Sequence, residues 1–198
     1  MENLKIILAS SSPRRKELLK KIGLSFKIKK SSVNEHFKVK LKPHLFAEYW
    51  AEKKAKSISK SNKNSLIIGA DTIVVINGLI LGKPADKQES IAMLKRLSGN
   101  VHEVITGVSI IYRKLDLIDT FHSTTKIFFN RCDEKSLKEY IKDEKPFDKA
   151  GSYGIQDSIA KYIKKIDGCY YNALGFPISK FHDRYNLILK SIKDANPN

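Results

Sequence analysis

The sequence predicts an α/β protein built on a mixed β-sheet with helices on its faces. Short apolar runs of strand length alternate with longer stretches of helical periodicity along the 198 residues, which is typical of a sheet covered by helices. The dipeptide Asn77-Gly78 lies between two apolar runs and predicts a β-hairpin. Because antiparallel pairing then occurs beside helix-connected strands, we expect the sheet to be mixed.

The N-terminal part predicts a strand, a loop and a helix in that order. The apolar run 5–9 is of the right length for a buried strand. Ser12 is placed to cap a helix, Pro13 suits its first position and Gly23 suits its end. A second helix is predicted from Pro43, followed by a polar loop at residues 57–65. The buried face of this second helix is expected to hold Leu45, Phe46, Tyr49 and Trp50.

The central and C-terminal parts continue the alternation. A strand at 66–70, continued at 73–76, is expected to turn at Asn77-Gly78 and return at 79–81. Asp86 and Glu89 have the spacing of a capping box and predict a helix that stops at Gly99. The remaining elements are predicted as strands at 101–112 and 115–129, a helix at 133–142, a strand at 159–166, and a helix from Pro177 that carries Phe181, Leu187 and Ile188.

The organisation of the chain fits one domain, residues 1–198, or two lobes that share a sheet. No internal repeat or low-complexity linker divides it. The longest apolar runs are a few residues, and the N-terminus lacks a signal-peptide pattern, so we expect a cytoplasmic protein that does not enter a membrane. Cys132 and Cys169 lie far apart in the sequence, which excludes a dense disulfide framework and a zinc-type spacing.

The formal net charge of +16 is compatible with several partners, among them nucleic acid, a membrane surface and a polyanionic small molecule. The lysines are spread along the whole chain, and neither a zinc-finger spacing nor an aromatic RNA-recognition motif accompanies them. We therefore interpret most of them as a solvated surface and do not expect dedicated nucleic-acid binding.

A turn that suits phosphate groups is predicted between the first strand and the first helix. Ser10, Arg14 and Arg15 place a hydroxyl and two guanidinium groups at a helix N-terminus. Free amides and the helix dipole favour an anion there, and arginine can bind phosphate with paired hydrogen bonds. The alternative is an ordinary N-cap followed by a solvent-facing arginine pair, and both readings stay open at this point.

A lone carboxylate, Asp71, interrupts an apolar segment at what is predicted to be a strand end. Burial of a carboxylate without a partner is expensive, so such a residue needs a metal, a cation or a proton. The alternative is a turn-capping aspartate. Lys83 follows the predicted hairpin at a distance that allows a return toward Asp71, although a lysine in such a loop is more often exposed.

Two further segments carry candidate ligand-binding groups. Glu35 lies in a polar stretch and is a weak candidate metal ligand, while the five scattered histidines predict no zinc site. A hard cation held by carboxylates stays open. The glycine-containing segment 146–156 offers Tyr153 for stacking and Gln156 for reading a base edge. Its alternative is a long connection between a helix and a strand.

Taken in order, these blocks resemble the Maf family of nucleoside triphosphate pyrophosphatases, from about residue 6 to about residue 178. The matching blocks are Leu8-Ala9-Ser10-Ser11-Ser12-Pro13-Arg14-Arg15, Gly69-Ala70-Asp71-Thr72, Gly82-Lys83-Pro84, Leu97-Ser98-Gly99, Thr106-Gly107-Val108, Asp148-Lys149-Ala150-Gly151 and Leu174-Gly175-Phe176-Pro177. The resemblance implies an elongated α/β fold with a central cleft, similar to inosine triphosphate pyrophosphatases. It also implies cleavage between the α and β phosphates, a divalent cation (Mg²⁺ or Mn²⁺) and a homodimer.

The resemblance also implies roles for individual residues. Asp71 matches the catalytic proton acceptor, and with Glu35 it matches the metal-binding positions. The positions implied for substrate binding and specificity are Ser10, Arg14, Arg15, Lys54, Thr72, Lys83 and Gln156. The chain departs from the family pattern at Asp157, where glycine is expected beside the base-reading position, and at Phe176, where leucine is expected.

Arg14, Thr72 and Gln156 are similar to the dTTP/UTP branch of the family, which favours pyrimidine triphosphates as substrates. One alternative is hydrolysis of 7-methyl-GTP or another purine triphosphate; that branch has a different residue after the catalytic aspartate and an acidic one near the position of Gln156. A second alternative is a non-catalytic nucleic-acid-binding or cell-division factor, which the net charge of +16 favours.

Overall fold

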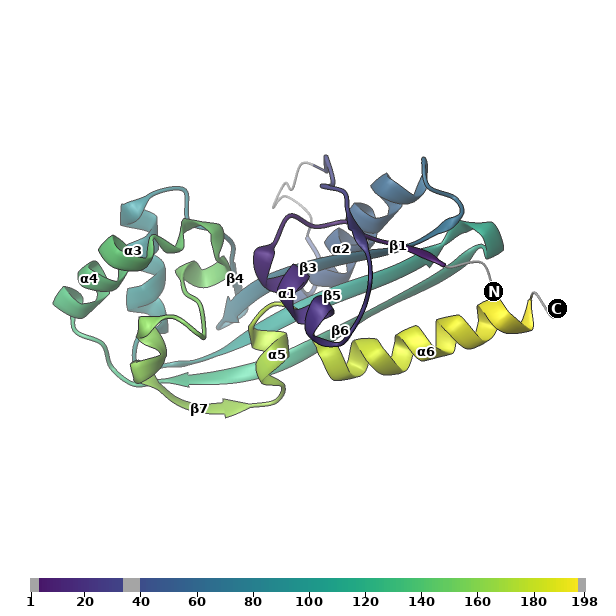
Figure 1. The fold of residues 1–198 in the computed structure, drawn as a ribbon. Coiled ribbons are helices and arrows are strands. Elements are labelled where there is room, and N and C mark those ends of the chain that lie inside the picture. The colour runs from purple at the N-terminus through teal and green to yellow at the C-terminus, as the bar shows by residue number, and fades with distance from the viewer. Residues whose placement is uncertain (1–3, 34–39, 196–198) are drawn as a thin grey trace. The chain divides into compact units, whose positions relative to one another are not determined.

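The computed structural model describes residues 4–33 and 40–195, and they form an α/β fold with a seven-stranded mixed sheet flanked by helices (Figure 1). The predicted fold class is confirmed. The strands are β1 (Lys5–Leu8), β2 (Lys27–Ile28), β3 (Ser65–Ile76), β4 (Leu79–Leu81), β5 (Val101–Tyr112), β6 (Leu117–Phe129) and β7 (Ile163–Asp167). The helices are α1 (Pro13–Lys21), α2 (Pro43–Ser59), α3 (Lys87–Leu97), α4 (Glu134–Glu144), α5 (Tyr170–Ala173) and α6 (Ile178–Asp194). Short 3₁₀ turns cover Arg113–Leu115, Pro146–Asp148, Ala150–Ser152 and Ser158–Tyr162.

The sheet mixes parallel and antiparallel pairs. Its strand order is β2-β1-β3-β5-β6-β7, with β4 paired to β3. β1 runs parallel to both β2 and β3, whereas β4 is antiparallel to β3 and β7 is antiparallel to β6. The predicted hairpin is therefore confirmed, with Asn77 and Gly78 as its turn.

The chain divides into two compact units. Unit 1 comprises Met1–Asp71, Thr106–Ser123 and Gly175–Asn198, and unit 2 comprises Thr72–Ile105 and Thr124–Leu174. Each unit has apolar clusters of its own. One cluster of unit 1 consists of Ile7, Ala9, Ala55, Ile67 and Ile111, and the cluster of unit 2 includes Val74, Leu94, Leu97, Ile127, Leu137 and Ile141. In unit 2, α3 and α4 lie side by side (Figure 1).

Helix ends follow the capping signals of the sequence. The Ser12 hydroxyl accepts a hydrogen bond from the Arg15 amide at the start of α1. Asp86 caps α3 by accepting from the Glu89 amide at 2.8 Å. Glu89 accepts in turn from the amide of Ala85, one residue before the cap. These side chains satisfy amides that have no partner inside the helix.

Three local predictions are wrong. The expected loop 57–65 begins only after Ser59, because the hydroxyls of Ser57 and Ser59 donate to carbonyls three residues earlier and fit into the last turns of α2. The expected strand 159–166 is a 3₁₀ turn up to Tyr162, and only the segment from Ile163 pairs with β6. Leu45 is exposed, at 42%, because it lies off the face that α2 buries.

Among residues 4–33 and 40–195, no helix combines the length and the apolar character that crossing a bilayer requires.

Candidate active site

Helix α2 lies unusually close to strand β3, because both present small residues at their contact. A Cβ atom built on Gly69 would lie 2.3 Å from the Ala51 carbonyl oxygen and 2.8 Å from the Ala55 nitrogen. Only glycine fits this approach, since real Cβ atoms do not come so near to backbone atoms. Ala51 and Ala55 are fully buried one helical turn apart. The approach brings the side chains of α2 within reach of β3.

The close packing of α2 on β3 pairs Lys54 with Asp71. Asp71 is two residues beyond Gly69, so it points to the same face of the strand. The Lys54 Nζ atom lies 2.7 Å from the Asp71 Oδ1 atom, and the two side chains are 12% and 8% exposed. Removal of one partner from a buried pair leaves an uncompensated charge, which typically costs about 3–5 kcal/mol.

Asp71 lies inside a continuous strand, Ser65–Ile76, and the prediction that it stands at a strand end is wrong. The strand does not have to stop at the carboxylate, because the lysine of the neighbouring helix supplies the partner that burial requires. The alternative of a turn-capping aspartate is therefore wrong as well. A buried carboxylate with one cationic partner can accept a proton or contribute to an oxygen-ligand site.

The turn between β1 and α1 is held by its own polar side chains. The Ser10 hydroxyl accepts from the Ser12 amide and from the Arg15 Nη1 atom, both at 3.2 Å. The Arg15 Nε atom donates to the Gly175 carbonyl at 3.0 Å, and Arg15 is only 9% exposed. The alternative of a solvent-facing arginine pair is thus wrong for Arg15, while Arg14 is half-buried. The guanidinium of Arg15 fixes the loop whose amides open α1.

The predicted specificity residues of unit 2 lie on β3 and on two loops. Thr72 is half-buried and, as the residue after Asp71, points to the opposite face of β3. Lys83 and Gln156 are both exposed. The loops that carry these two residues are joined, because the Gly151 amide donates to the Gly82 carbonyl at 2.9 Å. The return of Lys83 toward Asp71 stays a prediction.

Tyr153 is a core residue, and the prediction that it stacks on a ligand is wrong. Its side chain is 6% exposed and packs edge-on against the rings of His102 and Phe129. The Tyr153 hydroxyl lies 2.7 Å from the His102 Nε2 atom. Burial raises the pKa of Tyr153 above its usual value and lowers the pKa of His102 from 6.5 to about 4. Both groups are therefore neutral near pH 7.

The expected metal site is described only in part. Glu35 lies outside the described residues, so the structure does not place it. Within the described ranges, no group of three or more histidine, cysteine, aspartate or glutamate side chains is arranged to hold a metal ion. The oxygens of Asp71 suit a hard cation such as Mg²⁺ or Mn²⁺. Asp71 alone supplies too few ligands for such a cation, and Glu35 stays the other predicted ligand.

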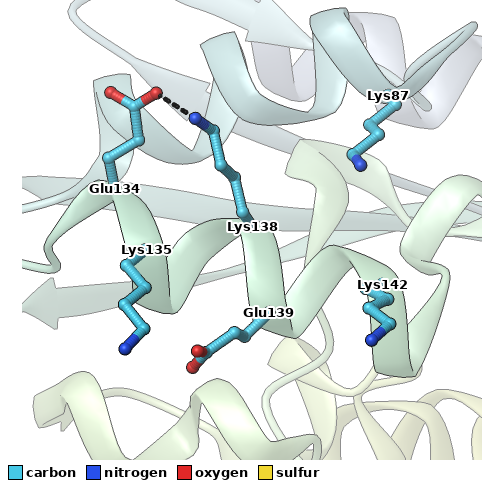
Figure 2. Close-up of a pocket in the computed structure, with 6 residues that line it drawn as sticks. All are labelled: Lys87, Glu134, Lys135, Lys138, Glu139 and Lys142. Atoms are coloured by element: carbon cyan, nitrogen blue, oxygen red, sulfur yellow. Dashed lines mark ion pairs between the residues drawn. The ribbon is translucent and has the colours of Figure 1, made fainter.

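A shallow pocket of about 500 Å³ in unit 2 contains none of the predicted site residues. It lies over α4 and the start of α3 (Figure 2), and its lining is Lys87, Glu134, Lys135, Lys138, Glu139 and Lys142. Glu134 pairs with Lys138 at 2.8 Å and with Lys95 at 2.6 Å. These ion pairs are exposed, and such pairs are typical of a solvated surface.

Comparison with known proteins identifies the family. A family described as Maf-like protein matches residues 5–186. The chain belongs to the Maf family. A relative from Pelotomaculum thermopropionicum is 41% identical over 178 residues, which cover 90% of this chain and 93% of the relative. Relatives from Bacillus pumilus and Cytophaga hutchinsonii are each 44% identical, over 88% and 92% of this chain and 92% and 84% of their own lengths. All three are named dTTP/UTP pyrophosphatase.

Two features of this Maf-family chain were missed from the sequence. One is the packing of α2 on β3, which the spacing of Ala47, Ala51 and Ala55 at every fourth position could have indicated. The other is a buried polar cluster of Asp157, Tyr140 and Lys149, for which the only signal in the sequence is the departure of Asp157 from the family pattern. Both are tertiary contacts between segments that are distant in sequence or irregular in structure.

Proposed function

We propose that this Maf-family chain is a nucleoside triphosphate pyrophosphatase that hydrolyses dTTP and UTP, and related modified pyrimidine triphosphates. The products are the nucleoside monophosphate and pyrophosphate. Relatives of 41–44% identity over most of the chain carry the name of this activity. The structural observation that supports it is the buried pair of Lys54 and Asp71, at 2.7 Å. By the family resemblance, Asp71 matches the catalytic position and Lys54 matches a substrate-binding one.

In the proposed reaction, Asp71 accepts a proton from water while the water oxygen attacks the α-phosphorus. The bond between that phosphorus and the bridging oxygen breaks, and pyrophosphate leaves. A carboxylate within reach of the water can contribute about 10²- to 10⁴-fold to such a step. Lys54 holds the carboxylate in place through the 2.7 Å contact and counters negative charge that develops on the phosphates.

The turn of Ser10, Arg14 and Arg15 is the proposed phosphate-binding element. Its amides stand at the N-terminus of α1, where the helix dipole favours an anion. Arg15 fixes this turn through Gly175 and Ser10, so the amides need little rearrangement when a phosphate binds. The proposed role of Lys83 is to balance the charge on the leaving pyrophosphate.

Gln156 and Thr72 are the proposed pyrimidine-selecting residues. A carboxamide offers one acceptor and two donors, which can match the N–H and carbonyl groups on the edge of uracil or thymine. The Gln156 side chain is exposed and available for this contact. A carboxylate at position 156 could only accept hydrogen bonds, so Gln156→Glu should impair recognition of UTP more than Gln156→Ala does.

A divalent cation, a homodimer and a cytoplasmic location remain expectations from the family resemblance. Asp71 and Glu35 would hold the cation, which would supply charge screening for the phosphates when bound.

The proposal is tested with purified protein, Mg²⁺ and a panel of triphosphates, by comparison of kcat/KM for pyrophosphate release. UTP and dTTP should exceed ATP, GTP and 7-methyl-GTP by at least about tenfold, which corresponds to the loss of about one well-made hydrogen bond. Preference for a purine would favour the first alternative function. Failure to turn over any triphosphate, together with salt-sensitive binding of RNA or DNA, would favour the second.

A further inference from the structure

The residue proposed to read the base, Gln156, stands between two anchored neighbours. Ile155 is 5% exposed and packs in the apolar core of unit 2. The Asp157 side chain is 7% exposed. Gln156 itself is exposed. The direction of an exposed side chain between two buried ones depends on how both neighbours are held. Here the core holds Ile155 and polar contacts hold Asp157.

Asp157 is buried with two donors on one oxygen. Its Oδ2 atom accepts from the Tyr140 hydroxyl at 2.8 Å and lies 3.1 Å from the Lys149 Nζ atom. Lys149 is 12% exposed, and its contact with the exposed Asp148 is longer, at 3.7 Å. Burial and the hydrogen bond to Asp157 raise the pKa of Tyr140 above its usual value, so the hydroxyl keeps its proton and donates.

The Tyr140 hydroxyl also accepts from the backbone. The Gly154 amide donates to it at 3.2 Å, so one hydroxyl on α4 contacts both Gly154 and Asp157. The Asp157 amide donates to the Gly154 carbonyl at 3.0 Å and closes a four-residue turn. A Cβ atom on Gly154 would lie 2.6 Å from the Asp157 carboxylate, because that carboxylate folds back over Gly154. Gln156 is the third residue of this turn.

We propose that Asp157 is a positioning residue for substrate selection: with Lys149 and Tyr140 it holds the turn Gly154–Asp157 so that Gln156 presents its amide to the pyrimidine. This inference rests on the proposed function, in which Gln156 reads the base. It assigns to Asp157 a role in selectivity that depends on the backbone of the turn and requires no contact of Asp157 with the nucleotide.

The kinetic test measures kcat and KM for UTP and GTP in Asp157→Ala, Gln156→Ala and the double variant. Asp157→Ala should raise KM for UTP about tenfold and keep kcat within about twofold of wild type. The UTP/GTP ratio of kcat/KM should therefore fall by about the same tenfold factor. The double variant should lose no more selectivity than Gln156→Ala alone, because both changes remove the same contact, that of the Gln156 amide with the base. Asp167→Asn is the matched control, since Asp167 is an exposed carboxylate of unit 2, and it should leave both parameters unchanged.

If Asp157→Ala does not fold, Asp157→Asn takes its place; it removes the charge that pairs with Lys149 and keeps an acceptor for Tyr140. A variant that melts at a lower temperature but keeps the wild-type UTP/GTP ratio overturns the proposal. Losses of selectivity that add in the double variant also overturn it, because the two residues would then act separately. An unchanged ratio in Gln156→Ala removes the base-reading role and the inference with it.

Hydrogen exchange of the free protein separates this inference from the proposed function. The amides of Gly154 and Asp157 should exchange faster in Asp157→Ala and in Tyr140→Phe than in wild type and in Asp167→Asn. Unchanged exchange overturns the anchoring role, whether or not the protein hydrolyses UTP. Faster exchange in a protein that releases no pyrophosphate supports the anchoring and rejects the function.

Discussion

The two units each bury a carboxylate beside a lysine, but they do so on different scaffolds. In unit 1, Asp71 on β3 meets Lys54 on α2 at 2.7 Å. In unit 2, Asp157 in a loop meets Lys149 at 3.1 Å and also accepts from Tyr140. The first pair joins a helix and a strand. The second pair joins two residues of one irregular segment, which the Tyr140 hydroxyl ties to α4. Under the proposed function, a buried lysine–carboxylate pair serves reactivity between two regular elements and backbone placement in a loop.

The largest expected effect is on the carboxylate of unit 1. Asp71→Asn should lower kcat for pyrophosphate release from UTP by about 10³-fold, because an amide cannot accept the proton. The measurement is a steady-state assay, with circular dichroism to confirm folding. Near-normal release by a folded variant contradicts the assignment. Metal titration of the variant separates the two roles of Asp71, since loss of a ligand shifts the metal dependence and loss of a base does not.

His102 is a buried titratable side chain that has no oppositely charged partner among its described contacts, unlike Asp71 and Asp157. His102 in unit 2 has a pKa of about 4, lowered from 6.5 by burial. Between these values the unfolded chain binds a proton that the folded chain does not, so stability falls as the pH drops from 6.5 to 4 and levels off below. The free energy of unfolding should fall by about 3 kcal/mol over this pH interval.

The measurement is urea unfolding of wild type and His102→Phe at pH 7 and pH 4. The free energy of unfolding of His102→Phe should depend less on pH, and the difference between the two proteins should change by about 3 kcal/mol over this interval. His182→Gln is the control, because His182 is exposed, and it should follow wild type. Equal pH dependence of His102→Phe and wild type contradicts the buried neutral state.

Lys54 and Lys149, the lysines that pair with the two buried carboxylates, allow a direct comparison between the units. Lys54→Met should lower kcat about 100-fold, because it leaves Asp71 without its partner near the reacting groups. Lys149→Met should keep kcat within about twofold and lower the UTP/GTP ratio of kcat/KM about tenfold. The measurement is steady-state kinetics of both variants with UTP and GTP, which gives kcat and the ratio of kcat/KM. Equal losses of kcat in the two variants would remove the distinction between reactivity and placement.

The smallest expected effect is at the phosphate turn. Arg15→Lys removes the fixed geometry that serves both Gly175 and Ser10, and kcat/KM should fall about tenfold. Lys16→Ala is the control on the exposed side of the same helix and should change kcat/KM by less than about twofold. An equal fall in the two variants would mean that overall charge, and not the turn, governs binding.

Local signals in the sequence predicted much of the fold. Ser12, Asp86 and the Asn77-Gly78 turn were placed correctly, because each depends on contacts within a few residues. The end of α2 was missed, since serine disfavours helices in general but fits when its hydroxyl bonds to the preceding turn. The exposure of Leu45 was missed because several helix faces were apolar enough to be the buried one.

For the site, the sequence indicates candidate residues but not the side chains that they contact. Asp71 was recognised as a carboxylate that needs a partner, yet its position inside β3 and the pairing with Lys54 depend on the close approach at Gly69. The sequence predicts ligand stacking for Tyr153, although an aromatic ring in a glycine-rich segment fits a core equally well. Such contacts join segments distant in sequence, so spacing rules do not determine them.

Hydrolysis of UTP in ¹⁸O-labelled water, followed by mass spectrometry of the products, tests directly whether water attacks the α-phosphorus. Attack of water on the α-phosphorus places one labelled oxygen in UMP and none in pyrophosphate, and this is the result we predict. Label in pyrophosphate would mean that water attacks the β-phosphorus, and formation of UDP and inorganic phosphate would mean that the β–γ bond is broken. Either result would exclude the proposed reaction.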